Sequence, residues 1–312
     1  MKVKYIVTVV LVCFALLNVQ AQEQPEVVIE QYMSQVREQE YVQMPDRSLF
    51  SEANATALLD AVEHYYTDSL PDVRLKAYYF TYKAVKSSAD STLRSRAVKS
   101  LVNALQDSNS GNVGSVAVWL TQFSKRDFNS QAKDSLVSAL KRVPFYRDEI
   151  LKLAGFVGLT DQIDFIKGNL IGGLYRTGKE KWAAYLALAR MGDDEATAYC
   201  LGMVKQQGIN DDVVYELVPD LIYTRQKKAV DYVIEILQDT EENCTSGNPE
   251  FGGRIMCGYR VMEYLAPVIV DFPLATDDYG DLMTDDYEAA LQQLRVWFNT
   301  HQEGYTFVQG IY

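Results

Sequence analysis

Apolar residues recur at the spacing of an α-helix along most of this chain, from about residue 51 onward. They fall at positions i, i+3, i+4 and i+7, which places them on one stripe of a helix. Short segments rich in Asp, Asn, Ser and Gly separate the stripes and provide helix caps. This pattern predicts an all-α fold. The clearest stripes are Val98, Leu101, Val102 and Leu105; Ala132, Leu136, Ala139, Leu140 and Val143; Val214, Leu217, Val218 and Leu221; and Val230, Val233, Ile234 and Leu237.

Grouped in pairs, the predicted helices form a repeat. The intervals between the first helices of successive pairs are 40, 35, 32, 32 and 43 residues, and helical-hairpin solenoids have a period of this size. One further helix is expected over 51–66, and residues 22–45 either contain a helix near 27–37 or are partly disordered. The first helices of the pairs are expected to begin near Asp72, Asn112, Arg147, Lys179, Asp211 and Arg254.

One pair carries a recognisable turn. The segment Trp182-Ala-Ala-Tyr-Leu-Ala-Leu-Ala-Arg-Met-Gly-Asp-Asp-Glu-Ala196 resembles a HEAT repeat of the short bacterial kind, in which Leu-Gly-Asp-x-x-Ala joins the two helices. Here Met191 replaces that leucine, Gly192 permits a left-handed exit and Asp193 caps the next helix. The other pairs, over about 70–300, match in period and stripe only. The resemblance implies a right-handed superhelix whose concave surface is lined by the second helix of each pair. A non-repetitive helical bundle is the alternative.

The C-terminal region departs from the repeat. A loop over 240–253, a helix over 254–270 and an acidic insertion over 271–286 precede a last helix over 286–299, which is expected to cap the stack. The tail, with Tyr305, Phe307 and Tyr312, is expected to pack back onto this end. The predicted organisation is a signal peptide at 1–21, an N-terminal extension at 22–50, HEAT-like repeats at 51–239 and a loop-rich helical cap at 240–312.

The first residues predict export. Lys2 and Lys4 precede an apolar run over 5–17, and Val19 and Ala21 are small residues at the −3 and −1 positions of a cleavage site after Ala21. The run is short for a membrane anchor and no basic stop follows it. Lipidation at Cys13 is disfavoured because the residue before it is Val12. The mature chain is therefore expected to be soluble, in the periplasm or outside the cell.

The net charge limits the possible partners, and the cysteine spacing indicates which thiols could pair. Loss of Lys2 and Lys4 takes the formal net charge from −12 to −14, which disfavours nucleic acid as a partner. Cys244 and Cys257 flank a Gly-rich loop, and a disulfide between them is plausible in an oxidising compartment. Cys200 is on the apolar face of a predicted helix and is expected to be a core residue.

No catalytic or metal-binding motif is found. Asp277, Asp281, Asp285 and Glu288 partly match the spacing of an EF-hand loop, but Leu282 occupies the position that requires Gly. With two histidines in the chain, a His-rich zinc site is not expected, and there is no Gly-x-Ser-x-Gly or Cys-x-x-Cys sequence. No catalytic residue, cofactor or metal is therefore predicted.

Tyrosine is frequent, with 21 residues. Tyrosines at helical spacing are mostly core residues, but a run that covers much of a helix must expose some rings to solvent, a neighbour or a ligand. The speculative partner-binding residues are Tyr78, Tyr79, Tyr82 and Tyr232.

The function predicted from these patterns is binding. A non-catalytic, exported helical-repeat scaffold would bind a protein or peptide partner in the cell envelope. The alternative is an envelope enzyme or glycan-binding accessory that uses acidic and aromatic residues on the concave or C-terminal face.

Overall fold

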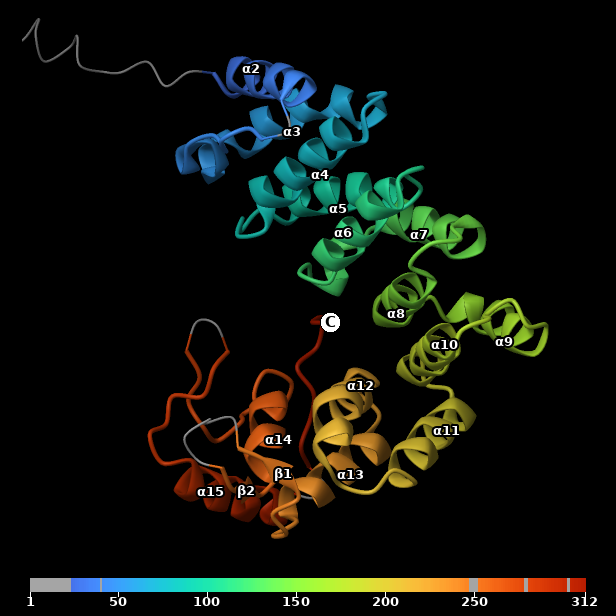
Figure 1. Ribbon diagram of the computed structural model, residues 1–312, viewed down its shortest axis with the longest axis vertical. Helices are drawn as coiled ribbons and strands as arrows, with labels where there is room; N and C mark the ends of the chain where they lie inside the picture. The colour runs from blue at the N-terminus through green and yellow to red at the C-terminus, as the bar shows by residue number, and fades with distance from the viewer. Residues whose placement is uncertain (1–23, 40, 247–251, 278–279, 302–303) are drawn as a thin grey trace, which may run out of the picture. The chain divides into compact units, whose positions relative to one another are not determined.

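The computed structural model describes residues 24–39, 41–246, 252–277, 280–301 and 304–312 (Figure 1). These residues form fourteen α-helices and two strands of two residues each, so the predicted all-α class is confirmed. None of the described helices is both long and apolar enough to cross a membrane. The predicted signal peptide and its cleavage after Ala21 lie outside the described residues.

The chain divides into two compact units, Met1–Ser88 and Ala89–Tyr312. The division falls in the short polar link after the helix Pro71–Val85. It therefore lies inside the range 51–239, for which the sequence predicts a single repeat array.

The first unit is a small helical domain of α2 (Pro25–Glu38), α3 (Ala55–Glu63) and α4 (Pro71–Val85). Proline begins both α2 and α4, at a position where no helical hydrogen bond is lost. Helices predicted over 27–37 and 51–66 correspond to α2 and to α3 with its flanking 3₁₀ turns. The helices pack through fully buried side chains, including Ile29, Met33, Leu58, Val73 and Phe80.

The second unit contains the remaining elements, which follow one another through short turns. They are α5 (Ser91–Ala104), α6 (Ser110–Leu120), α7 (Ser130–Arg142), α8 (Arg147–Val157), α9 (Ile163–Ile171), α10 (Gly178–Arg190), α11 (Asp194–Lys205), α12 (Val218–Tyr223), α13 (Lys227–Gln238), β1 (Cys244–Thr245), β2 (Arg254–Ile255), α14 (Gly258–Leu265) and α15 (Tyr287–Thr300).

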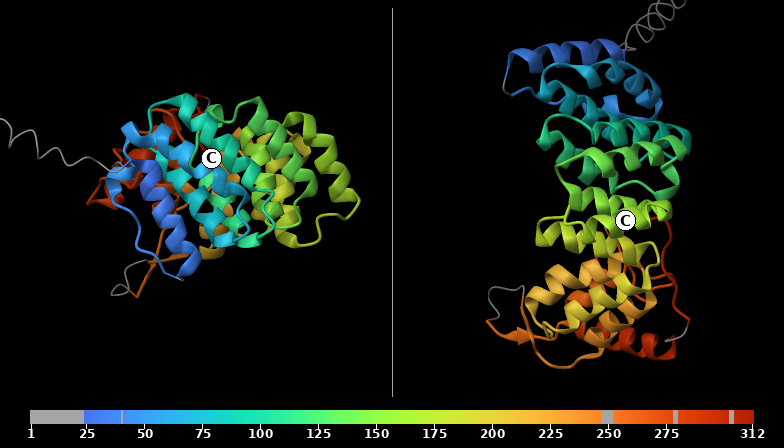
Figure 2. Two further views of the ribbon diagram at one scale, coloured as in Figure 1. Left: turned by 90° about the horizontal axis from the view of Figure 1, so that it is seen from above. Right: turned by 90° about the vertical axis from the view of Figure 1, so that its right-hand side faces the viewer.

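The helices of the second unit stack in two layers, in chain order (Figure 2). In one layer α6 contacts α8, α8 contacts α10, α10 contacts α12 and α12 contacts α14. We call this the first-helix layer, because its members begin the pairs predicted from sequence. In the other layer α5 contacts α7, α11 contacts α13 and α13 contacts α15.

Two glycines show how sequence determines this packing. Gly192 has φ +94° between α10 and α11, and the Asp193 carboxylate accepts a hydrogen bond from Ala196 N at 2.8 Å, as expected from the Gly-Asp sequence of this turn. Gly155 lets α8 and α10 approach closely, since a Cβ at this position would lie 2.7 Å from Ala187 Cα.

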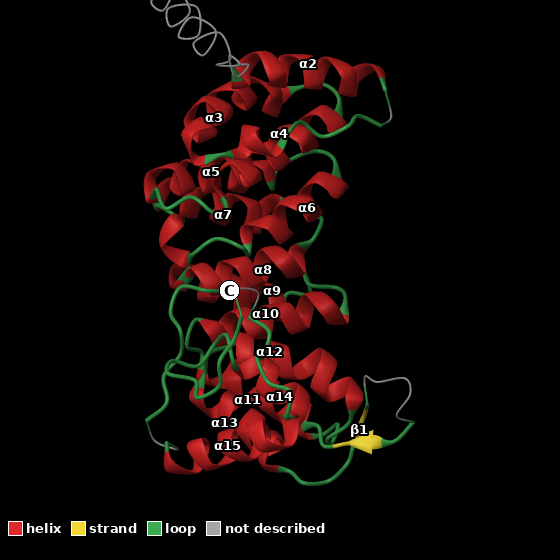
Figure 3. Cartoon of the chain, turned by 90° about the vertical axis from the view of Figure 1, so that its left-hand side faces the viewer, coloured by secondary structure: helices red, strands yellow, loops and turns green. Residues whose placement is uncertain are grey.

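The C-terminal part differs from the predicted helix over 254–270. Residues Arg254–Ile255 form β2, which pairs with β1, and α14 covers only Gly258–Leu265 (Figure 3). The helix ends at Leu265, shortly before Pro267, whose missing N–H and bulky ring disfavour continuation of the helix. The chain beyond pairs with the tail through a bridge between Ile269 and Phe307. The predicted last helix corresponds to α15, whose Leu291, Leu294 and Phe298 are buried against the stack.

Candidate functional site

A cavity of about 500 Å³ lies on the first-helix layer of the second unit. The expected binding surface used the second helix of each pair. This cavity is lined by the first helices of the predicted pairs, whereas a larger cavity, of about 820 Å³, is lined mainly by α13, α15 and Tyr305, on the layer of the second helices. The lining residues come from α6, α8, α10, the helical segment before and within α12, and the tail: Ala117, Val118, Thr121, Asp148, Glu149, Lys152, Lys179, Trp182, Ala183, Glu216, Leu217, Asp220 and Tyr312.

The last residues of the chain lead to this cavity. We call residues 304–312 the final segment. Its first half is held beside the chain that follows α14, with Val270 N donating to Thr306 O and Val308 N donating to Val268 O, both at 2.9 Å. Tyr305 packs against Phe298 of α15, and its hydroxyl donates to Asp231 at 2.7 Å. This half agrees with the expected packing of the tail onto the C-terminal end.

The second half of the final segment continues along the first-helix layer (Figure 1). Gly310, at φ +86°, turns the chain, and its carbonyl accepts a hydrogen bond from Lys125 N at 2.9 Å. Arg190 then donates to Ile311 O at 3.0 Å, and Arg225 donates to Tyr312 O at 3.2 Å. Three successive main-chain oxygens are therefore held by donors from separate elements.

The Tyr312 ring fills a slot with aromatic walls. Its centroid lies 5.4 Å from that of Phe156 on α8 and 5.3 Å from that of Tyr223 on α12. Burial, followed by the charges of Asp220 and Glu149, raises the pKa of Tyr312 above its ordinary value. We call the slot and the adjoining cavity together the groove.

The Lys125 amide belongs to a 3₁₀ turn, Lys125–Asp127, which is held in place by hydrogen bonds. Asp127 is 1% exposed and accepts from Arg94 Nε of α5, at 3.1 and 3.2 Å to its two oxygens. The same carboxylate accepts from Ser124 N at 3.1 Å, which closes a capping box around the turn. This ion pair, between a buried carboxylate and a half-buried arginine, fixes the turn against α5.

Carboxylates and lysines in the cavity form an ionic network. The two Asp220 oxygens accept from Lys152 Nζ at 2.6 Å and from Trp182 Nε1 at 2.5 Å. Lys179 bridges Asp148 and Glu149. Burial, and then the hydrogen bond with Asp148, raises the pKa of Glu149, whose Oε2 is buried without a partner.

The cavity wall before α12 is a π-helical turn, Val213–Leu217. Pro219 explains it, because proline has no N–H to donate and its ring clashes with the carbonyl four residues earlier. The wider turn contributes Glu216 and Leu217 to the cavity lining, just before Asp220. The proline inside a predicted helix was the available sequence signal for this irregularity.

Three of the four tyrosines proposed as partner-binding residues are buried. Tyr78, Tyr82 and Tyr232 have 4%, 8% and 8% of their surface exposed, which removes them from a binding surface and places them in the core. Tyr79 is half-buried and lines a separate cavity of about 560 Å³ in the first unit. None of the four lines the groove.

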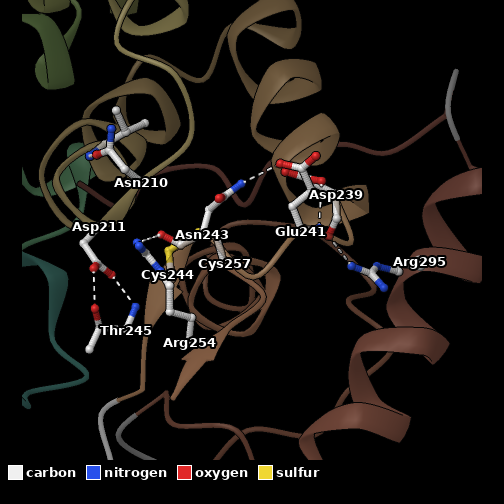
Figure 4. Close-up of a disulfide and its surroundings, with 11 residues drawn as sticks. Asn210, Asp211, Asp239, Glu241, Asn243, Cys244, Thr245, Arg254, Cys257 and Arg295 are labelled. Atoms are coloured by element: carbon white, nitrogen blue, oxygen red, sulfur yellow. Dashed lines mark hydrogen bonds between the residues drawn. A yellow bond between two sulfur atoms is a disulfide. The ribbon is translucent and has the colours of Figure 1, made fainter. Parts of the chain in front are cut away.

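The structure pairs Cys244 and Cys257 in a disulfide beside the two short strands (Figure 4). Asp211 supports β1 by accepting from Thr245 N at 2.8 Å and from Thr245 Oγ1 at 2.7 Å. Cys200 is buried, and burial raises the pKa of its thiol to about 12, which makes it unreactive.

Reduction of this disulfide is expected to destabilise the second unit by about 2 kcal/mol, because it closes a short loop and restricts the unfolded chain. Urea unfolding of a Cys244→Ser, Cys257→Ser double variant measures the effect without a reductant. Equal midpoints for the double variant and the wild type would show that the disulfide adds no stability.

Sequence reasoning missed the residues that hold the final segment. Arg190 and Arg225 follow apolar stripes at helix ends, where cations usually interact with the helix dipole in solvent. Tyr312 was recognised as part of an aromatic tail, but no local pattern indicates how far a tail extends along a stack.

The chain matches no protein-family model, and no curated protein is significantly similar to it in sequence.

Proposed function

We propose that this protein is a non-catalytic, exported helical-repeat scaffold that binds an extended peptide segment of a partner protein in the groove. The proposed architecture is a right-handed HEAT-like solenoid. Two observations support it: helices contact their neighbours within each layer in chain order, and the Gly192–Asp193 turn has the geometry of the motif. Export to the cell envelope is proposed from the signal-peptide pattern.

The main observation behind the proposal is the way in which the final segment binds to the first-helix layer. An extended stretch of chain lies on the first-helix layer, with its main-chain oxygens bonded to Lys125, Arg190 and Arg225 and one aromatic ring in a slot. Main-chain recognition combined with an aromatic anchor is how grooves bind extended peptides. The final segment therefore models the kind of ligand that the groove accepts.

The carboxylates in the cavity favour binding over hydrolysis. A glycosidase needs one carboxyl to donate a proton and a second that is free to attack or to activate water. Both Asp220 oxygens already accept hydrogen bonds, and Lys179 holds Asp148 and Glu149 together on α8. Asp220 and Asp148 therefore already have structural partners, whereas Glu149 Oε2 is buried without a hydrogen-bond partner and is assigned no catalytic role in this proposal.

A peptide added in trans tests the proposal. The peptide Gly-Tyr-Thr-Phe-Val-Gln-Gly-Ile-Tyr, which repeats residues 304–312, is labelled at its N-terminus and followed by fluorescence anisotropy. It should bind a full-chain Tyr312→Ala variant about ten-fold more tightly than the wild type, because the native segment competes at high effective concentration.

Two controls define the result. A scrambled peptide should not bind, and Tyr199→Ala, which removes an exposed ring from α11, should behave as the wild type. Failure of the peptide to bind Tyr312→Ala, or equal binding of the scrambled peptide, would exclude the groove as a peptide site.

A further inference from the structure

The cavity beside Tyr79, in the first unit, has a cationic lining. It has a volume of about 560 Å³ and is lined by the C-terminal half of α4, the chain just after it, and residues from 44–52. Its lining residues include three cations, Arg47, Lys83 and Lys86, and one carboxylate, Glu52. The cavities of about 820 and 500 Å³ in the second unit are each lined by four carboxylates and fewer cations. In a chain of formal net charge −12, the charge of this cavity therefore favours an anionic ligand.

The three cations come from two separate segments. Lys83 and Lys86 follow Tyr79 by four and seven residues, so the three side chains share one face at the end of α4. The dipole of α4 favours lysines at this end, but it does not account for Arg47, which belongs to the 3₁₀ turn Arg47–Phe50. Among the described residues, no carboxylate forms an ion pair with any of the three cations. Their charges are therefore available to a ligand.

The segment that contributes the arginine is fixed against the rest of the unit. The Asp46 carboxylate caps the 3₁₀ turn by accepting from the main chain of that turn at 2.9 Å. The ring of Phe50 packs on that of Phe80, with centroids 5.5 Å apart. Ser88 Oγ donates to Glu52 Oε1 at 3.0 Å, which links the two segments that line the cavity. The cavity is therefore preformed, and the carboxylate in its lining already accepts a hydrogen bond.

Tyr79 offers a surface for the organic part of a ligand. Of the four tyrosines predicted to bind a partner, it is the one that is not buried. Lys83 Nζ lies 5.9 Å from the centre of its ring, so a cation and an aromatic surface are adjacent. Met44 and Phe50 add apolar surface, and Met44 Sδ accepts from the Tyr32 hydroxyl at 3.3 Å. Cavities of roughly 300–1,000 Å³ with mixed apolar and charged walls are typical of small-molecule sites.

We propose that this cavity binds a phosphate monoester, with Arg47, Lys83 and Lys86 around the phosphate and Tyr79 beside the organic group. A phosphate monoester has a charge of about −1.5 to −2 at pH 7 and three acceptor oxygens, so it matches three cations better than a carboxylate does. The planar guanidinium can bind two of these oxygens, and the ammonium groups act as point charges. The site is separate from the groove, and the proposal does not depend on peptide binding there.

Three probes test the proposal. Phenyl phosphate, inorganic phosphate and benzoate are each titrated into the full chain by isothermal titration calorimetry. Phenyl phosphate should bind about ten-fold more tightly than inorganic phosphate, because its ring packs beside Tyr79. It should also bind about ten-fold more tightly than benzoate, which has a single charge, and added salt should weaken its binding. Failure of phenyl phosphate to bind, or equal binding of benzoate, would overturn the phosphate site.

Variants then locate the site. Arg47→Gln and Lys83→Gln should each weaken the binding of phenyl phosphate about ten-fold without changing the thermal unfolding midpoint. Tyr79→Leu should lower the affinity for phenyl phosphate to that for inorganic phosphate, whose own binding is retained and shows that the variant is folded. Lys76→Gln, which removes a lysine of α4 that does not line the cavity, is the matched control and should bind phenyl phosphate as the wild type does. Equal weakening by Lys76→Gln and Lys83→Gln would show a diffuse attraction and overturn the site.

Discussion

Substitution of Gly155 by valine is expected to destabilise the second unit by about 3 kcal/mol or more, at the upper end of the usual cost of overpacking. A Cβ at this position would lie 2.7 Å from Ala187 Cα and 2.6 Å from Tyr223 Oη. The first contact is with main chain, so α10 would have to move away from α8. The second would displace the Tyr223 hydroxyl from Lys152 O, to which it donates at 2.5 Å.

Urea unfolding followed by tryptophan fluorescence measures this effect. Trp119, Trp182 and Trp297 are the three tryptophans of the chain and all belong to the second unit, so the signal reports on that unit. The control is Gly168→Ala in α9, where no atom lies within 4 Å of the added Cβ. It should stabilise the unit by about 0.5–1 kcal/mol. An unchanged midpoint for Gly155→Val would contradict the close approach of α8 and α10.

Removal of the Asp127 side chain is expected to cost about 2–3 kcal/mol, because a buried carboxylate that accepts hydrogen bonds from a cation and from a main-chain amide is lost. Asp127→Ala takes the acceptor from Arg94 Nε and from Ser124 N, and the capping box that closes the turn is lost. The turn that presents the Lys125 amide should loosen with it. The final segment should therefore become more sensitive to protease than in the wild type.

Thermal or urea unfolding measures the loss, and limited proteolysis with mass spectrometry detects release of the final segment. Asp134→Ala, an exposed aspartate on α7, is the matched control and should change stability by no more than about 0.5 kcal/mol. Asp127→Asn should fall between the two, since an amide oxygen still accepts one hydrogen bond. If Asp127→Ala is as stable as the control, the ion pair does not fasten the turn.

The features that sequence predicted correctly are those that depend on residues close together in the chain. The apolar stripes determine the helices. The α10–α11 turn depends on the conformation of Gly192 and on a hydrogen bond from Ala196 N to Asp193, all within five consecutive residues. Periodicity also gave the order of the helix pairs. It did not indicate where cavities would lie, because both helices of a pair have one apolar face, and cavities occur on both layers.

The groove could not be predicted in the same way. Lys125, Arg190, Arg225 and Tyr312 come together only through tertiary packing, and each has an ordinary local explanation. The tyrosine clusters suggested a binding surface from local sequence, but tertiary packing buries most of these rings. Tyr78 sits on a helix crowded with aromatic residues, but packing inside the first unit buries it, with its hydroxyl donating to Tyr66 O at 3.3 Å.

The hydrogen bond from Lys125 N to Gly310 O makes the Lys125 amide hydrogen a probe of the end of the final segment. An amide hydrogen exchanges with solvent when its bond opens, and local opening requires far less free energy than global unfolding. The exchange rate of this one amide therefore measures how often the end of the final segment dissociates from the first-helix layer. The Val270 and Val308 amides, which pair the first half of the final segment with the chain after α14, should remain protected during the same event. The native chain thus contains both the moving part and the fixed reference needed to follow its release by hydrogen exchange.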